Sequence, residues 1–149
     1  MRTGIFVGSF NPFTIGHDSI VRRALPLFDR LVIGVVADNV HKPDMPQVEE
    51  RMQTIKELYA DDTRIEVKPF HGLAMDFAKA EGAQFIVKGV RSMSDFEYEQ
   101  WQADFNRQLG GIETILLYTE PQMASVSSSA LRELQHFGVD ISDFIPKKH

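Results

Sequence analysis

The chain has 149 residues, the size of one ordinary domain, so we expect a single domain over residues 1–149. With 21 acidic and 16 basic residues its formal charge is −5, which argues against a broad nucleic-acid surface because such surfaces need an excess of Lys and Arg. The absence of cysteine excludes disulfides, thiolate nucleophiles and cysteine-held metals. The longest apolar run, residues 31–37, is too short to span a bilayer, and no secretory signal precedes the first apolar run. We therefore expect a cytoplasmic protein with neither a membrane nor a nucleic acid as its partner.

Apolar runs of strand length alternate along the chain with stretches of helical period. The runs predict five strands, at residues 4–7, 31–37, 64–70, 84–88 and 112–118. Helices are expected between successive strands, with the fourth over residues 94–109 and a last one near residues 127–138. This order is typical of an α/β fold with a doubly wound, five-stranded parallel sheet and helices on both faces. Ligands of such sheets bind beyond the carboxyl ends of the strands, where the strand order reverses.

The stretch "GSFNPFTIGH", residues 8–17, directly follows the first predicted strand. Gly8 lets another group approach the backbone closely, and Gly16 frees the backbone just before His17, which enters the first turn of a helix. A helix N-terminus favours an anion, and a histidine there adds a donor. Taken alone, the stretch is better explained as an ordinary tight turn capped by His17, because such turns are common.

Three other loops that follow strands carry cations or hydroxyls. Lys42 lies in "NVHKPDMP", Lys88 and Arg91 lie in "KGVRSMSDFEYE", and "SVSSSALRE" places serines at a helix start. Each has an ordinary explanation, because a loop lysine is usually solvated and a serine before a helix is usually an N-cap. All these loops leave the same edge of the predicted sheet, however, so together they indicate one site for several phosphates.

These motifs also resemble a known family. Thr14-Ile15-Gly16-His17 is similar to the T/HxGH signature of Rossmann-like nucleotidyltransferases, and "SVSSSALRE" is similar to their serine-rich phosphate motif. Within that superfamily the block "KGVRSMSDFEYEQWQADFNRQL" resembles the bacterial phosphopantetheine adenylyltransferases, and the resemblance covers residues 3–146. It implies a single nucleotidyltransferase domain that transfers the adenylyl group of ATP to 4'-phosphopantetheine, giving dephospho-coenzyme A and pyrophosphate.

The resemblance also implies roles for individual residues. His17 would stabilise charge on the α-phosphate of ATP, with Ser9, Lys42 and Arg91 as the other catalytic positions. The positions expected to bind phosphopantetheine are Ser9, Lys42, Ala74, Lys88 and Asn106. Those expected to bind ATP are Ser9, Phe10, His17, Gly89, Val90, Arg91, Glu99, Met123, Ala124, Ser125, Val126, Ser127, Ser128 and Ser129.

The implied reaction fits these residue types. Its nucleophile is a phosphate oxygen that already carries charge at pH 7, so no general base is needed, and no Ser-His-Asp set or carboxylate dyad stands out in the sequence. Positioning and cationic stabilisation would overcome the repulsion between two anionic substrates. We expect Mg²⁺ to accompany ATP, held by phosphates and water rather than by protein ligands.

Three positions depart from the family's usual pattern. Ser9 replaces a threonine but keeps the hydroxyl, Lys88 replaces the planar fork of an arginine with a point charge, and residues 123–125 lack an aromatic residue often found before the serines. Alternatives are another nucleotidyltransferase of this fold, such as a nicotinamide-nucleotide adenylyltransferase or a glycerol-phosphate cytidylyltransferase, and a non-catalytic nucleotide sensor.

The predicted fourth helix carries the large aromatic residues Phe96, Tyr98, Trp101 and Phe105. Such residues either pack into the core or form an oligomer interface. The resemblance implies a homohexamer built as two trimers, which favours the interface.

Overall fold

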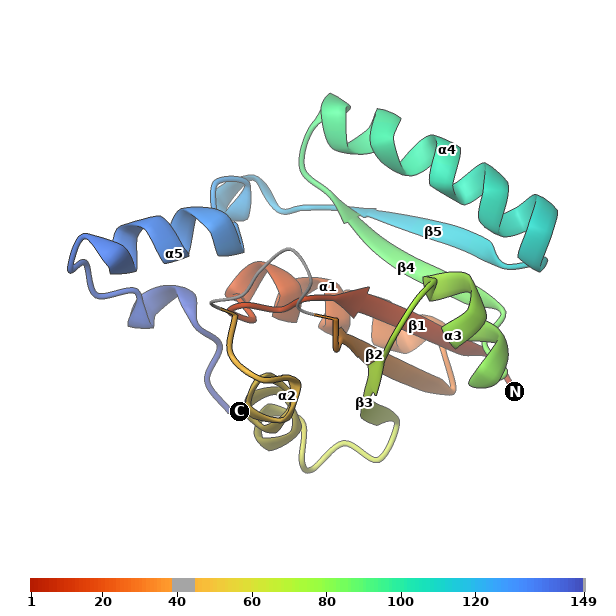
Figure 1. Cartoon of the computed structure of the whole chain (residues 1–149), viewed down its shortest axis with the longest axis horizontal. Coiled ribbons are helices and arrows are strands. Elements are labelled where there is room, and N and C mark those ends of the chain that lie inside the picture. Colours follow the sequence, from red (N-terminus) through yellow and green to blue (C-terminus); the bar gives the residue numbers. More distant parts are fainter. Residues whose placement is uncertain (39–44, 149) are drawn as a thin grey trace.

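A computed structural model describes residues 1–38 and 45–148. Five parallel strands form one sheet in the order β3-β2-β1-β4-β5 (Figure 1). They are β1 (Thr3–Gly8), β2 (Arg30–Val36), β3 (Ile65–Phe70), β4 (Phe85–Val90) and β5 (Glu113–Tyr118). The sequence prediction of a five-stranded, doubly wound parallel sheet in a single domain is confirmed, with each strand displaced by at most two residues at either end.

The helices follow the strands in the predicted alternation. They are α1 (Ile15–Ala24), α2 (Val48–Leu58), α3 (Ala74–Ala80), α4 (Met93–Gly110) and α5 (Ser128–His136). Pro26 lies in a short 3-10 turn that follows α1, since a proline cannot continue the hydrogen-bond pattern of an α-helix. Gly82 and Gly138 take positive φ angles of 70° and 84° just beyond α3 and α5, as expected of residues that end a helix.

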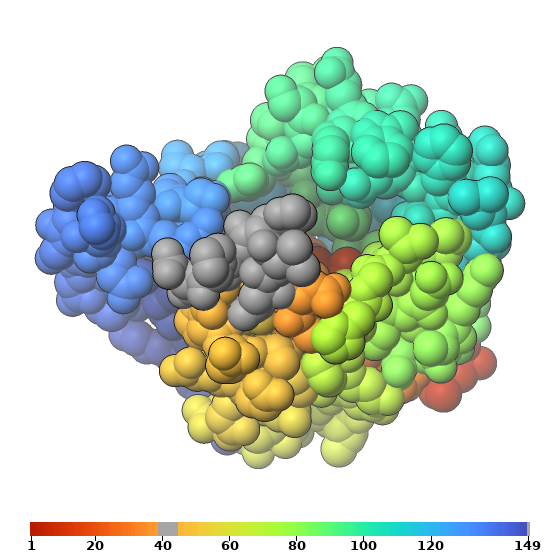
Figure 2. All heavy atoms as spheres, viewed as in Figure 1, coloured from red at the N-terminus to blue at the C-terminus, as the bar shows by residue number. Residues whose placement is uncertain are grey.

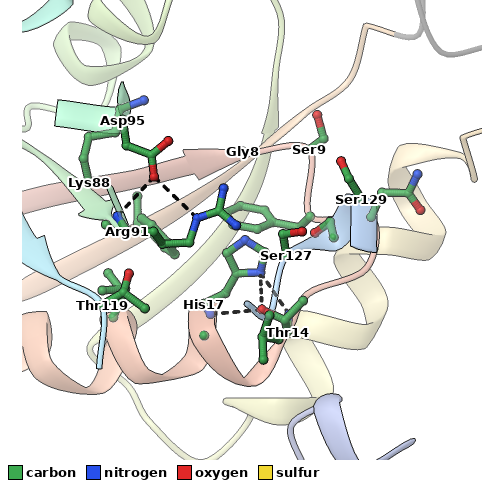
Figure 3. Close-up of a pocket in the computed structure, with 18 of the residues that line it drawn as sticks. Gly8, Ser9, Thr14, His17, Lys88, Arg91, Asp95, Thr119, Ser127 and Ser129 are labelled. Carbon is green, nitrogen blue, oxygen red and sulfur yellow. Dashed lines mark hydrogen bonds and ion pairs between the residues drawn. The ribbon is translucent and has the colours of Figure 1, made fainter. Parts of the chain in front are cut away.

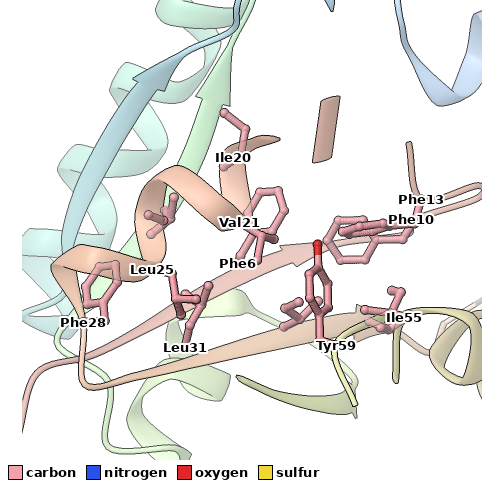
Figure 4. Close-up of a cluster of buried hydrophobic side chains, with 14 of the residues drawn as sticks. Phe6, Phe10, Phe13, Ile20, Val21, Leu25, Phe28, Leu31, Ile55 and Tyr59 are labelled. Carbon is pink, nitrogen blue, oxygen red and sulfur yellow. The ribbon is translucent and has the colours of Figure 1, made fainter. Parts of the chain in front are cut away.

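Two hydrophobic clusters cover the two faces of the sheet. On one face α1 and α2 pack against alternate residues of the central strands, among them Phe6, Leu31 and Ile33 (Figure 4). On the other face α3 packs on Ile5 and Val32. Neighbours along β1 and β2 thus point to opposite faces, which is why these strands read as continuous apolar runs in the sequence.

Helix α4 differs from the others because none of its residues is buried. Tyr98, Trp101 and Phe105 are each about half exposed and contact one another edge to face along the helix. Within one chain, therefore, these aromatic residues do not form core. Separately, none of the helices in the described part of the chain has the length and apolar character needed to cross a membrane.

The strand order reverses between β1 and β4, because the chain builds β2 and β3 on one side of β1 and then returns to β4 on the other. The carboxyl ends of these two neighbouring strands lead into residues 8–14 and 91–92. In the view of Figure 2 the surface is hollowed between α4 and α3, and atoms of the N-terminal segment are visible at the bottom of the hollow. This edge of the sheet is where a ligand is expected.

Candidate active site

A cavity of about 370 Å³ lies at the reversal point, between the ends of β1 and β4 and the first turns of α1, α4 and α5 (Figure 3). Eleven of the residues that the sequence predicts for the site line it: Ser9, Phe10, His17, Lys88, Gly89, Arg91, Glu99, Val126, Ser127, Ser128 and Ser129. Three of the four loops that we expected to converge therefore do so here: those that follow β1, β4 and β5.

The remaining predicted site residues lie elsewhere or are not described. Val90 is buried in the sheet, Ala74 begins α3, and Asn106 lies in the second half of α4. Residues 123–125 follow β5 and do not line this cavity. Lys42 lies outside the described residues.

The hydrogen bonds at the start of α1 determine how His17 presents its imidazole. The Thr14 hydroxyl accepts from the His17 backbone N–H at 3.3 Å, while the Thr14 backbone N–H donates to Nδ1 of His17 at 2.9 Å. This is the reciprocal arrangement of a capping box, with histidine in the place of the usual Glu or Gln. Because Nδ1 accepts a hydrogen bond, the proton of the neutral ring is on Nε2, which is left as a donor.

The surroundings of His17 keep its ring neutral. Burial, together with the positive charge of Arg91, lowers the pKa of His17 from 6.5 to about 4. The Phe13 ring stacks on the imidazole at a centroid distance of 5.2 Å, and Phe10 meets it edge on at 5.0 Å. At pH 7 the side chain is thus an oriented, uncharged N–H donor between aromatic rings.

Two cations at the end of β4 face carboxylates of α4. Lys88 Nζ lies 3.5 Å from Glu99, and Arg91 Nε lies 3.5 Å from Asp95. Asp95 also accepts from the Arg91 backbone N–H at 3.1 Å, which places Arg91 at the entrance to α4. Both ion pairs are long, so the cations lie where an anionic ligand can replace part of each contact.

The serines at the start of α5 have separate structural tasks. Ser127 caps the helix, its hydroxyl accepting from the Ala130 N–H at 3.1 Å. Ser128 donates to the Pro12 carbonyl at 2.8 Å, so it fastens α5 to the loop that follows β1. The N-cap explanation is therefore correct for Ser127, and the capped N-terminus still faces the cavity.

Several cavity residues were not predicted: Asn11, Thr14, Asp95, Thr119 and Arg132. Arg132 donates to the Asn11 carbonyl at 2.5 Å and to the Ser129 hydroxyl at 3.2 Å. Its position one helical turn after Ser128 in "SVSSSALRE" was the available signal. Asp95 could have been found from its place three residues after Ser92, the N-cap of α4, whose hydroxyl accepts from the Asp95 N–H.

The cavity is built to receive anions. It combines a neutral N–H donor, the three cations Lys88, Arg91 and Arg132, and the N-terminus of α5, which carries partial positive charge. Within residues 1–38 and 45–148 no three His, Asp or Glu side chains are grouped as metal ligands would be. These residue types suit a ligand with several phosphates.

Comparison with known proteins gives consistent results. Residues 5–134 match the model of the family described as cytidylyltransferase-like. The phosphopantetheine adenylyltransferase of Phocaeicola vulgatus is 51% identical over 147 residues, which cover 99% of this chain and 97% of that protein. Its counterparts in Bacteroides fragilis and Clostridium perfringens are 50% and 40% identical, each over 99% of this chain and at least 90% of theirs.

Solved structures agree on the fold. A bifunctional NMN adenylyltransferase/ADP ribose pyrophosphatase from Francisella tularensis superposes with a TM-score of 0.73 over 99% of this chain, although identity is 16%. The match spans 46% of that longer protein. A lipopolysaccharide core biosynthesis protein from Thermoplasma volcanium matches with a TM-score of 0.58, 22% identity, and coverage of 80% of this chain and 97% of that one.

Proposed function

The chain belongs to the phosphopantetheine adenylyltransferases of the cytidylyltransferase-like family, and from this premise we propose that it transfers the adenylyl group of ATP to the phosphate of 4'-phosphopantetheine. The products are dephospho-coenzyme A and pyrophosphate. Identity of 51% over 99% of the chain carries this assignment. The alternatives of a nicotinamide-nucleotide or glycerol-phosphate nucleotidyltransferase are not supported, since the similarity to an NMN adenylyltransferase extends to the fold alone.

His17 would act on the charge that develops during transfer. The substrate phosphate attacks the α-phosphate of ATP in line with the departing pyrophosphate, and negative charge grows on the α-phosphate oxygens. An Nε2–H held by the Thr14 contact can donate to one of these oxygens without reorienting. With a pKa near 4 and with Nδ1 already accepting from the Thr14 N–H, the ring would be a poor general base, and the attacking phosphate needs none.

The other groups would bind and orient the two substrates. Ser9 and Lys88 would hold the phosphate of phosphopantetheine, with Lys42, Ala74 and Asn106 assigned to the same substrate by resemblance. The residues that the resemblance assigns to ATP would bind the nucleotide: Phe10, Gly89, Val90, Arg91, Glu99, Met123, Ala124, Ser125, Val126, Ser127, Ser128 and Ser129. Val90 and residues 123–125 among them do not line the cavity. The α5 N-terminus supports a place for the β- and γ-phosphates, because its N–H groups face the cavity.

Mg²⁺ would enter with ATP. The two carboxylates on the cavity wall, Asp95 and Glu99, each face a cation, so the donor set fits an ion held by phosphate oxygens and water better than one held by the protein. Bound there, the ion would neutralise part of the phosphate charge. ATP as substrate supports a cytoplasmic location.

The assignment is tested by incubating the purified chain with ATP and Mg²⁺ and either 4'-phosphopantetheine or nicotinamide mononucleotide, and measuring pyrophosphate. We expect release with phosphopantetheine only, and loss of release when EDTA is added in excess of Mg²⁺. Release with nicotinamide mononucleotide but not with phosphopantetheine would contradict the assigned substrate. Tight ATP binding without release in either mixture would instead identify a nucleotide sensor.

We also propose that six copies assemble as two trimers. The half-exposed aromatic residues Tyr98, Trp101 and Phe105 on α4 support assembly, because large aromatic side chains are enriched at such interfaces. Light scattering is expected to give a mass near six times the 16.9 kDa of one chain, even after dilution. A mass of one chain would refute the assembly without affecting the assigned reaction.

A further inference from the structure

Arg51 is a charged side chain inside the protein. It lies in α2 and only 5% of its surface is exposed. Burial lowers the pKa of Arg51, which shows that the surroundings disfavour its charge. A buried charge is costly unless hydrogen bonds replace its water, so the partners of this guanidinium define why it is tolerated here.

Among residues 1–38 and 45–148, the guanidinium donates to backbone carbonyls of three segments. Its Nη1 atom donates to the Ser9 carbonyl at 2.7 Å and to the Val36 carbonyl at 2.9 Å, and its Nε atom donates to the Pro46 carbonyl at 2.9 Å. Ser9 follows β1, Val36 ends β2, and Pro46 precedes α2. One rigid planar group therefore sets the spacing between these segments.

The helix that carries Arg51 is itself held against α1. The hydroxyl of Tyr59, at the end of α2, donates to the Asp18 carboxylate at 2.6 Å. Ile55, one turn before Tyr59 in the same helix, is fully buried. Asp18 directly follows His17 in α1. Arg51 thus connects Ser9 to a framework that also includes the helix bearing His17.

We propose that Arg51 is a positioning residue for adenylyl transfer: by holding the Ser9 carbonyl to the end of β2 and the start of α2, it places Ser9 for the incoming phosphate. Arg51 does not line the cavity, whereas Ser9 does, so Arg51 would act through Ser9. This inference rests on the proposed function, in which Ser9 binds the phosphate of phosphopantetheine. The acceptors are the backbone carbonyls of Ser9, Val36 and Pro46, so the connection depends on the Arg51 side chain and not on the side chains of these three residues.

The test is Arg51→Lys, which keeps the charge but offers a single donor atom in place of two nitrogens on one plane. We expect kcat to fall by roughly 10- to 100-fold, the effect of displacing a reacting group by about 1 Å. We also expect KM for phosphopantetheine to rise clearly while KM for ATP changes less. Steady-state pyrophosphate release, with each substrate varied in turn, measures all three.

The matched control is Ile55→Val, which loosens α2 packing without touching the three carbonyls. Its melting temperature should fall while both KM values stay at those of the unmodified protein. If Arg51 had a merely structural role, Arg51→Lys would behave like Ile55→Val: its melting temperature and its fraction of active molecules would fall, but its KM values would not change. That result would overturn the proposal. So would full kcat in folded Arg51→Lys. Absence of turnover in the unmodified protein would instead refute the proposed function.

If Arg51→Lys does not fold, Pro46→Gly tests the same connection from the other side. Pro46 is exposed, so its replacement leaves the core intact while freeing the backbone that presents one of the carbonyls. We expect KM for phosphopantetheine to rise in this variant relative to the unmodified protein. An unchanged KM and kcat would overturn the proposal.

Discussion

Replacing His17 with alanine should lower kcat by roughly 10²- to 10³-fold with little change in affinity for ATP. The reason is that the Nε2–H meets charge that develops only in the transition state, and loss of one such donor typically removes about 2.7–4 kcal/mol of transition-state stabilisation. Its orientation depends on the Thr14 N–H bond to Nδ1 and on stacking with Phe13. Pyrophosphate release at saturating substrates measures kcat, and equilibrium titration measures ATP affinity.

His17→Gln separates catalysis from folding in the same experiment. Glutamine is a standard residue at this place of a capping box, so its side-chain oxygen can accept from the Thr14 N–H and preserve the start of α1. We expect this variant to melt close to the unmodified protein and yet to lose most of its kcat. Unchanged turnover in either variant would remove His17 from the mechanism.

The second large effect is on stability as a function of pH. In the unfolded chain His17 takes up a proton below about pH 6.5, whereas in the folded chain it does so only near pH 4. Between these values the unfolded state binds more protons, so the free energy of unfolding should fall as the pH is lowered from 6.5 towards 4. The loss approaches about 3 kcal/mol, from roughly 1.4 kcal/mol per pKa unit.

Urea unfolding from pH 7.5 to 4.5 measures this loss, and His17→Gln is its control. The difference in unfolding free energy between the two proteins should be constant above pH 7 and should shift in favour of the variant as the pH falls. Subtracting the two curves removes the contribution of carboxylates, which titrate in both. Parallel curves would mean that His17 has an ordinary pKa and is protonated more easily than its burial implies.

Much of the fold follows from the sequence because burial on both faces makes strands such as β2 continuously apolar. Once five alternations are recognised, the parallel sheet and its reversal point limit where a ligand can lie, and cavity residues such as His17, Arg91 and Ser129 come from the loops at that edge. Convergence of separate loops was predictable from topology alone.

Other features depended on tertiary contacts that leave no local pattern. A charged residue such as Arg51 within an amphipathic helix is expected to be solvated, and the carbonyls of Ser9, Val36 and Pro46 that it contacts come from separate parts of the chain. A cap by His17 was expected, but its reciprocal pairing with Thr14 was not, because the usual capping box has Glu or Gln at this position. The sequence could not show whether the aromatic residues of α4 are exposed or packed in the core, since a core helix and an interface helix have the same aromatic composition.

The bonds between α5 and the loop after β1 have a consequence for how the protein is made. Ser128 and Arg132 hold the carbonyls of Pro12 and Asn11, partners separated by 116 and 121 positions. During synthesis the N-terminal half of the cavity leaves the ribosome long before the helix that braces it. The enzyme therefore cannot acquire a complete cavity until nearly all of its chain has been translated, and a product truncated after β5 would lack both the helix and the support of the loop beside Ser9.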